Sequence, residues 1–216
     1  MNTLAPETDY SQWGEQIIIL DFFDGRVGRF LDLGAYDGVT GSNTRMLAER
    51  GWEGVSIEAS PRAFWMLLEK MVAFPKVELV NAAAMPESGI VRFYETHSAI
   101  STCMTEHHID TWLKTSYWVA GITPTQIAAR FGGHFDFVSL DIEGMEIPLL
   151  ATMAPILGQT ELICVEERIH NTERDEKYYE AMLAGMAAHG FDQLIARTND
   201  ASGNLLYAKG GKQVTE

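Results

Sequence analysis

The sequence predicts an α/β fold with an open, mostly parallel sheet and helices on both of its faces. Short apolar runs at residues 30–33, 54–57 and 77–80 alternate with longer segments of helical periodicity, which is the rhythm of repeated β-α units. The first run ends in a turn that contains Gly34 and Gly38, as expected at the carboxyl end of the first strand of such a sheet. The chain of 216 residues is long enough to bury one large core.

The main sheet is expected to have seven strands, of which the last two form an antiparallel hairpin. They cover residues 30–33, 54–57, 77–80, 135–140, 162–165, 191–196 and 205–208. Residues 90–94 alternate apolar with polar side chains, which predicts a further, half-exposed strand. We interpret residues 1–216 as a single domain, with an N-terminal helical segment at 1–29 and an irregular, substrate-facing insertion at 96–121.

Capping residues mark the starts of several expected helices. The helices cover residues 11–23, 39–50, 60–71, 123–131 and 177–188. Ser11 is the expected N-cap of the first helix, while Ser60 and Thr123 each precede a proline that suits the first helical position. Gln126 completes a capping box with Thr123. Local chemistry therefore predicts where three of the helices begin.

The charge balance restricts the partners. There are 16 Lys and Arg residues against 30 Asp and Glu residues, a net charge of −14, which repels nucleic acid and anionic membranes. No apolar run approaches the length of about 18 residues that spans a membrane, and the first residues lack the layout of a signal peptide. Cys103 and Cys164 are too few for a disulfide framework. We therefore expect a cytoplasmic protein with a small-molecule partner and no nucleic-acid partner.

The turn after the first strand predicts the kind of cofactor. Tyr36 and Asp37 occupy its middle, so the turn lacks the three glycines of the pyrophosphate-binding pattern G-x-G-x-x-G. Glu58 ends the next strand about 20 residues further on, where a carboxylate accepts hydrogen bonds from two ribose hydroxyls. A ribose site without a pyrophosphate site indicates S-adenosylmethionine. Ala82 and Ala83 follow the third strand, where small side chains either leave room for a flat adenine or simply pack closely.

Polar side chains also follow the fourth and fifth strands. Asp141 and Glu143 come after the fourth strand, and Glu166, His170 and Asn171 come after the fifth. Carboxylates at the ends of buried strands are costly unless they are used, which predicts a reaction centre. His170 is the expected catalytic base, because an unperturbed imidazole with a pKa of about 6.5 is mostly neutral at physiological pH. Alternatively, the carboxylates and the amide of Asn171 hold Mg²⁺, which prefers such oxygen donors.

The segment at 96–121 interleaves aromatic with polar side chains, among them Trp112 and Trp118. Sugar rings stack on aromatic side chains, so we expect these two tryptophans to contact the methyl acceptor. A structural lid or an oligomer contact is the alternative. The histidines of this segment do not have the spacing of a zinc site.

Four motifs, in order along the chain, resemble those of the FkbM family of S-adenosylmethionine-dependent methyltransferases. They lie at Ser11-Gln12-x-Gly14-Glu15, at residues 30–38 with Ser42-Asn43-Thr44, at residues 51–61, and at Leu140-Asp141-Ile142-Glu143-Gly144-x-Glu146. The resemblance spans residues 10–208. It implies the class I methyltransferase fold, a Rossmann-like seven-stranded sheet of order 3-2-1-4-5-7-6 with strand 7 antiparallel. It also implies O-methylation, commonly of sugars or natural products.

The resemblance also implies roles for individual residues. The expected cofactor contacts are Gly34, Ala35, Asp37, Gly38, Glu58, Ala82, Ala83 and Asp141. The family pattern places the glycine turn at the methionine part, Glu58 at the ribose, one of the two alanines at the adenine and Asp141 at the sulfonium. Gln16 departs from the pattern because one branch of the family usually has aspartate there, and Ala59 departs because a Glu-Pro pair is common after the second strand.

Two other classes of function remain open. A non-catalytic module that binds S-adenosylmethionine would keep the cofactor turn without the chemistry. A nucleotide-dependent oxidoreductase would need the absent phosphate loop and would bind NAD. The polar residues at the strand ends favour an enzyme. The first prediction is therefore an O-methyltransferase that acts on a hydroxyl of a small carbohydrate-like or natural-product acceptor.

Overall fold

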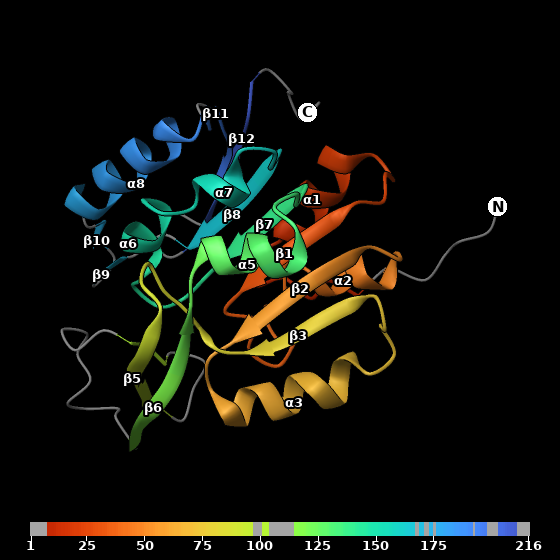
Figure 1. Cartoon of the computed structure of the whole chain (residues 1–216). Helices are drawn as coiled ribbons and strands as arrows, with labels where there is room; N and C mark the ends of the chain where they lie inside the picture. Colours follow the sequence, from red (N-terminus) through yellow and green to blue (C-terminus); the bar gives the residue numbers. More distant parts are fainter. Residues whose placement is uncertain are drawn as a thin grey trace.

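A seven-stranded sheet forms the centre of the molecule (Figure 1). The computed structural model describes residues 8–96, 101–103, 115–166, 169–170, 173–174, 176–191, 193–197 and 203–210, and for 169–170, 173–174 and 193–197 it describes the backbone alone. The strands of the sheet are β1 (Arg29–Leu33), β2 (Glu53–Glu58), β3 (Val77–Asn81), β7 (Phe137–Leu140), β8 (Leu162–Glu166), β11 (Gln193–Arg197) and β12 (Asn204–Ala208). Their order is β11-β12-β8-β7-β1-β2-β3.

The order of the main sheet agrees with the prediction. Strands β1, β2, β3, β7 and β8 pair in parallel, whereas β12 pairs antiparallel with both β8 and β11. In the numbering of the class I pattern this is 3-2-1-4-5-7-6, with the seventh strand reversed. Because parallel strands end at the same edge of a sheet, the residues that follow β1, β2, β3, β7 and β8 are brought together there.

A second, three-stranded sheet departs from the prediction. It has the order β4-β6-β5 and consists of β4 (Ala83–Ala84), β5 (Gly89–Glu95) and β6 (Thr115–Ile122). The half-exposed strand expected at 90–94 is confirmed as β5. The expectation of irregular structure throughout 96–121 was wrong for residues 115–121, because these pair antiparallel with β5 along its whole length. Residues 97–100 and 104–114 of that segment lie outside the described residues.

Helices cover both faces of the main sheet, as expected. They are α1 (Glu15–Phe23), α2 (Arg45–Glu49), α3 (Pro61–Met71), α5 (Pro124–Phe131), α6 (Glu146–Leu150), α7 (Ala154–Leu157) and α8 (Glu176–Ala188). Alternate side chains of β1 point to opposite faces: Phe30 packs with α1, α2 and α3, whereas Leu31 and Leu33 pack with α5, α6, α7 and α8. A short ribbon, β9 (Ile169–His170) with β10 (Glu173–Arg174), follows β8.

The first helix begins later than expected. Ser11 does not act as its N-cap, because Gly14 in a left-handed conformation precedes Glu15, the first helical residue. The hydroxyl of Ser11 instead accepts a hydrogen bond from the backbone N–H of Gln16 at 3.2 Å. At the other end of the sequence, Asn204 of β12 donates to the buried Glu15 carboxylate at 2.7 Å. The N-terminal helix is therefore tied directly to the reversed strand.

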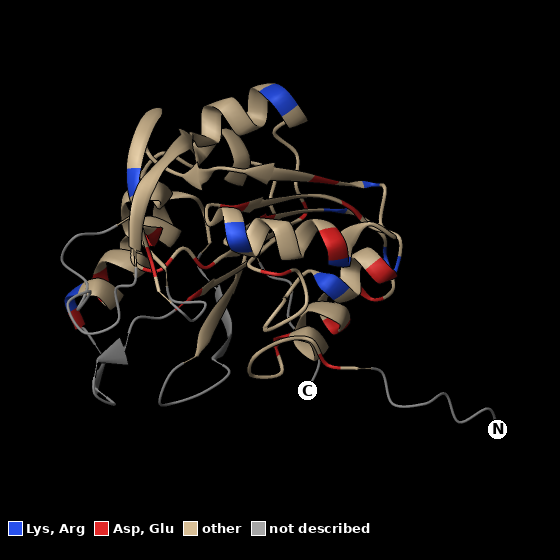
Figure 2. Cartoon of the chain, turned by 90° about the horizontal axis from the view of Figure 1, so that it is seen from below, with Lys and Arg blue, Asp and Glu red and all other residues tan. Residues whose placement is uncertain are grey.

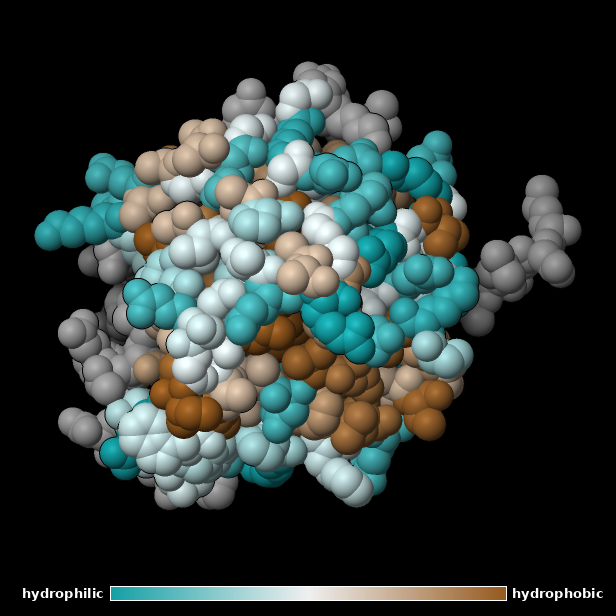
Figure 3. Space-filling model, in the orientation of Figure 1, coloured by the Kyte–Doolittle hydropathy of each residue, from teal (hydrophilic) through white to brown (hydrophobic). Residues whose placement is uncertain are grey.

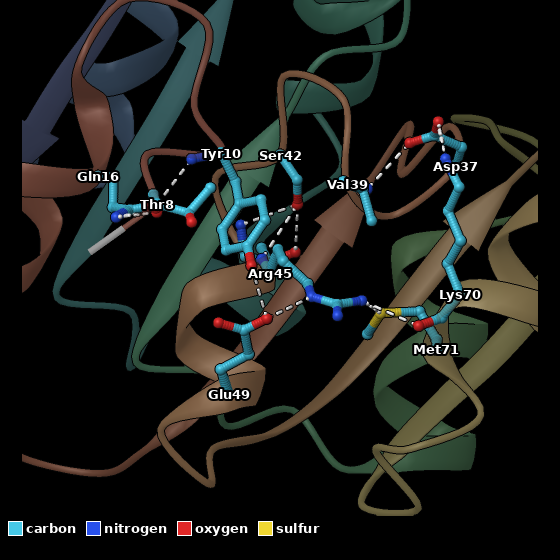
Figure 4. A network of polar contacts seen from close by, with 11 residues as sticks. Thr8, Tyr10, Gln16, Asp37, Val39, Ser42, Arg45, Glu49, Lys70 and Met71 are labelled. Carbon is cyan, nitrogen blue, oxygen red and sulfur yellow. Dashed lines mark hydrogen bonds and ion pairs between the residues drawn. The ribbon is translucent and has the colours of Figure 1, made fainter. Parts of the chain in front are cut away.

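The second helix, α2, is much shorter than the one expected at 39–50. Asp37 accepts a hydrogen bond from the backbone N–H of Val39 at 2.9 Å, and Ser42 Oγ accepts from the first residue of the helix at 3.0 Å. Figure 4 shows both contacts. Local side-chain bonds therefore hold the residues after the turn at 34–38 in a non-helical path, and the helix starts only at Arg45, which follows Thr44 as its N-cap.

The predicted caps of α3 and α5 are confirmed. Ser60 Oγ accepts from Ala63 N at 3.1 Å, and Thr123 with Gln126 forms a complete capping box. Trp65 and Leu68 of α3 are exposed, as is Val72 directly after the helix. Figure 3 shows hydrophobic surface in the lower half of the view, where α3 and β3 lie in Figure 1. Among the described residues, no helix is long and apolar enough to cross a membrane.

Removing the α5 cap should lower the stability of the fold. Thr123→Ala loses the hydroxyl that accepts from the backbone N–H of Gln126, so we expect the free energy of unfolding to fall by about 1 kcal/mol. In a chain of this size that corresponds to a fall in Tm of about 2–4 °C. Thr125→Ala, at an exposed position of the same helix, is the control and should leave Tm nearly unchanged. Equal melting temperatures for the two variants would contradict the capping role.

Candidate functional site

A cavity of about 380 Å³ opens at the carboxyl ends of the parallel strands. Residues 34–36 after β1, 58–60 after β2, 82–84 after β3 and 141–143 after β7 line it, together with Glu166 of β8. The second sheet adds Phe93 and Glu95 from the inner side of β5. The cavity therefore lies where open α/β sheets bind their ligands.

The turn after β1 is held against both neighbouring strands. Gly34 has φ +90°, and a Cβ atom at this position would overlap the carbonyl oxygen of Asp141. The backbone N–H groups of Gly34 and Ala35 both donate to the carbonyl oxygen of Ile57, at 3.0 and 3.1 Å. Only glycine fits here, and its backbone therefore faces the cavity without a side chain in between.

Glu58 connects two turns at the rim of the cavity. One of its carboxylate oxygens accepts from Tyr36 N at 2.8 Å, and the other accepts from Ser60 N at 2.6 Å. Burial raises the pKa of Glu58 to about 7, against the effect of these two hydrogen bonds. Each carboxylate oxygen has a second lone pair, so the group can also accept hydrogen bonds from a ligand. Glu58 lines the cavity, and the ribose contact stays a prediction.

Asp37 and Gly38, two other expected cofactor contacts, are not among the residues that line the cavity. The Asp37 carboxylate pairs with Lys70, as Figure 4 shows. Burial opposes the ionisation of Asp37, but hydrogen bonds from Lys70 and from nearby backbone N–H groups lower its pKa below the ordinary value. A Cβ atom on Gly38 would meet the side chain of Leu67 at 2.6 Å. Both residues shape the turn from its outer side.

Three carboxylates gather at the ends of β7 and β8, as the sequence predicted. Asp141, Glu143 and Glu166 each contribute an oxygen atom to a group whose members lie within 4.8 Å of one another. Burial and the neighbouring carboxylates raise the pKa of Asp141 to about 7 and that of Glu143 to about 9, and they raise that of Glu166 well above its ordinary value. The group therefore holds protons near neutral pH unless a cation enters it.

Glu146, the last acidic residue of the same motif, has a different role. Its buried carboxylate accepts from the backbone N–H groups of Ile142 and Gly144 at 2.9 Å each, and from the hydroxyl of Tyr178 at 2.7 Å. Glu143 and Gly144 both have positive φ angles, of 57° and 104°. The Glu146 carboxylate closes this strained turn and so positions the carboxylates of Asp141 and Glu143.

The expected base and acceptor contacts are only partly described. The backbone of His170 lies in β9, paired with Glu173, but its side chain lies outside the described residues. Asn171 and Trp112 also lie outside them. Trp118 is on β6, 66% exposed, and is not among the residues that line the cavity.

Several polar residues of the site had no role in the sequence analysis. Asp32 is buried within β1 and accepts from the hydroxyl of Thr44 at 2.6 Å, and burial raises its pKa to about 6. Asn43 places its amide nitrogen 3.5 Å from Ser139 Oγ, and its Oδ1 has no partner among the described residues. The sequence signal for Asp32 was its position as a charged residue inside the apolar run at 30–33.

The cavity is strongly acidic. Its acidic residues are Asp32, Glu58, Glu95, Asp141, Glu143 and Glu166. Among the described residues that line it, Arg62 is the one basic residue. Figure 2 shows acidic residues in many parts of the chain, in line with the 30 acidic against 16 basic residues of the sequence. In their ionised form these carboxylates attract cations and disfavour anionic ligands.

The raised carboxyl pKa values predict a stability that falls as the pH rises. In the folded chain Asp141 and Glu143 release their protons at about pH 7 and 9, compared with ordinary pKa values of 3.8 and 4.5. The folded state therefore binds more protons than the unfolded state across this window, and the free energy of unfolding decreases with rising pH. We expect a lower Tm at about pH 9 than at about pH 6. For a chain of this size, Tm falls by about 2–4 °C for each kcal/mol by which the free energy of unfolding decreases.

Glu143→Gln removes one of these groups and should make Tm less dependent on pH. Glu87→Gln, in the exposed turn before β5, is the control and should keep the wild-type slope. Differential scanning calorimetry at several pH values measures both variants. A wild-type Tm that rises steadily from pH 6 to pH 9 would show that these carboxyl groups are ionised in the folded chain.

Comparisons with known proteins agree with this geometry. The family model described as Methyltransferase FkbM domain matches residues 32–192. A search of curated protein sequences gives no match. Among solved structures, the N-terminal domain of EvdMO1 with SAH bound has a TM-score of 0.52 at 14% identity, over 95% of this chain and 82% of that one.

Two further structures share the fold at low identity. The fibrillarin pre-rRNA processing protein of Methanococcus jannaschii has a TM-score of 0.54 at 16% identity, over 87% of this chain and 68% of that one. The precorrin-6y C5,15-methyltransferase of Geobacter metallireducens has a TM-score of 0.51 at 10% identity, over 96% and 93%. These likenesses show the fold alone. The family match covers most of the chain, and the protein therefore belongs to the FkbM methyltransferase family.

Proposed function

We propose that this chain transfers the methyl group of S-adenosylmethionine to a hydroxyl oxygen of a small, uncharged, carbohydrate-like or natural-product acceptor. The observation that carries the proposal is the acidic cavity at the carboxyl ends of the strands, where the glycine turn and Glu58 face the carboxylates that follow β7 and β8. Membership of the FkbM methyltransferase family supports methyl transfer. The SAH in the EvdMO1 structure supports this choice of cofactor.

The cavity offers a suitable surface to each part of the cofactor. Gly34 and Ala35 present backbone at one side, and Glu58 has lone pairs for ribose hydroxyls. Ala82 and Ala83 leave space for a flat base. Asp141, once ionised, places negative charge opposite the expected sulfonium, and a positive ligand would relieve the repulsion among the carboxylates. The same charge argues against phosphorylated or carboxylated acceptors.

The carboxylates at the end of β7 and β8 also suit the proton transfer that the reaction needs. S-adenosylmethionine, when bound, supplies a methyl group on a positively charged sulfur, which keeps the bonding electrons as the acceptor oxygen bonds to the carbon. The acceptor hydroxyl gives up its proton, and a base with a pKa near the working pH takes it most efficiently. His170 is the proposed base, and Asp141, with a pKa of about 7, lies at the same end of the sheet.

A divalent cation is the second proposal for this end of the cavity. The oxygen atoms of Asp141, Glu143 and Glu166 lie within 4.8 Å of one another, and hard carboxylate donors of this kind suit Mg²⁺. Asn171 would be a further oxygen donor. Such an ion would lower the pKa values of the same carboxylates. The two proposals therefore predict different responses to chelators.

Ligand binding and turnover test the proposed function. Isothermal titration calorimetry should detect SAH binding and no NAD binding. Transfer of label from methyl-labelled S-adenosylmethionine should then occur to some members of a panel of uncharged sugars and hydroxylated metabolites, and not to their phosphorylated forms. NAD binding without SAH binding would refute the proposal. SAH binding without turnover on any acceptor would favour a non-catalytic binding module.

Removing the carboxylate of Glu58 should weaken cofactor binding. Hydrogen bonds to a charged group contribute about 1.5–3 kcal/mol, so we expect Glu58→Ala to raise the Kd for SAH at least about tenfold. Glu58→Gln keeps the shape but loses one acceptor, and it should show a smaller loss. Glu53→Ala, at the exposed opposite end of β2, is the matched control. Unchanged SAH affinity in folded Glu58→Ala would show that Glu58 only holds the turns.

His170→Ala separates the two proposals for the reaction centre. If His170 is the base, the variant should lose about 100-fold or more in kcat, with the Kd for SAH unchanged. Treatment with a chelator should leave the wild-type rate unaffected. Wild-type turnover in His170→Ala, together with loss of activity on chelation and recovery with Mg²⁺, would replace the base with a metal site.

A further inference from the structure

We propose that the second sheet recognises the base of the cofactor: Glu95 of β5 accepts a hydrogen bond from the exocyclic amino group of adenine, and Phe93 packs against the ring. This inference rests on the proposed function, since it assumes that an adenosine group enters the cavity. It adds two residues from outside the main sheet to the expected contacts at Ala82 and Ala83.

Glu95 is held beside the expected ribose site by a single residue. Ser60 donates through its backbone N–H to one oxygen of Glu58 at 2.6 Å, and through its hydroxyl to one oxygen of Glu95 at 2.5 Å. The same hydroxyl accepts from Ala63 N and caps α3. Two carboxylates thus lie on either side of one serine, and both line the cavity. A ribose on the first places its base within reach of the second.

The surroundings of Glu95 suit a flat aromatic ring. Phe93 and Glu95 are two residues apart on β5, so their side chains share a face of the strand. Phe93 is buried and packs with Ala83 of β4, and the partly buried Ala59 packs against the same cluster. These small alanine side chains, the Phe93 ring and the Glu95 carboxylate all line the cavity, so its wall combines apolar surface with one acceptor.

The hydrogen-bonding chemistry of Glu95 distinguishes adenine from related bases. The Ser60 hydroxyl donates to one oxygen of Glu95, and the hydroxyl of Tyr117 lies beside the same pair. Burial raises the pKa of Tyr117 to about 12, so this neighbour stays protonated and does not compete as an anion. An ionised carboxylate accepts hydrogen bonds and donates none. At the 6-position it therefore accepts from the amino group of adenine, whereas the oxo group of hypoxanthine offers it no hydrogen.

The alternative is that Glu95 only joins the two sheets through Ser60. Both interpretations predict some loss of stability when Glu95 is changed. They differ in selectivity, because a purely structural carboxylate has no preference for the group at the 6-position of the purine. The test therefore compares SAH with S-inosylhomocysteine, in which an oxo group replaces that amino group and N1 carries a hydrogen, while the ribose and the amino-acid part are unchanged.

Isothermal titration calorimetry of both ligands tests the inference. The wild-type protein should bind SAH at least about tenfold more tightly than S-inosylhomocysteine. Glu95→Gln, whose side-chain amide can donate as well as accept, should reduce this ratio to about twofold by weakening SAH and not the analogue. Phe93→Leu should weaken both ligands by the same factor. Glu87→Gln, in the turn before β5, is the control and should keep the wild-type ratio.

The outcomes distinguish this inference from the proposed function. Failure of the wild-type protein to bind SAH overturns the proposed function and the inference together. SAH binding with a ratio near one in the wild type, or with an unchanged ratio in Glu95→Gln, overturns the inference alone. Melting temperatures of the variants show whether they are folded. If Glu95→Gln does not fold, Glu95→Asp, which shortens the reach of the carboxylate, should still lower the ratio.

Discussion

The carboxylate of Glu58 is the contact on which the geometry of the cavity depends. It joins the turn after β1, through Tyr36 N, to the start of α3, through Ser60 N. Ser60 in turn joins α3 to Glu95 of the second sheet. Elements from both sheets are therefore positioned relative to one side chain at the end of β2. The cavity keeps its shape because these contacts are short and share the residues Glu58 and Ser60.

The acidic lining of the cavity opposes folding in the absence of a ligand. Asp141, Glu143 and Glu166 raise one another's pKa values. In the folded chain these carboxyl groups therefore either stay protonated or repel one another. Glu146 stabilises the same turn by accepting two backbone N–H groups. One carboxylate thus provides the hydrogen bonds that keep the others close. Stability is reduced at a site where a cationic ligand would restore it.

Local sequence signals predicted the elements that local chemistry determines. The strands of the main sheet and the caps at Ser60 and Thr123 follow from residues within a few positions of one another. Strand β6 could not be predicted in this way, because its regularity comes from pairing with β5. The short α2 follows from Asp37, which the sequence pattern assigned to the cofactor. The contact between Ser60 and Glu95 joins residues 35 positions apart and had no sequence signal.

The contact between Glu15 and Asn204 has a consequence for synthesis on the ribosome. Asn204 begins β12, which lies between β8 and β11 in the sheet although it comes after both in the chain. The N-terminal helix is translated early, but its buried Glu15 carboxylate gains this partner only after 189 further residues have been added. Until then β8 has an open edge in the nascent chain, where another strand can pair with it. Chaperone binding during translation would therefore protect the strand that carries Glu166.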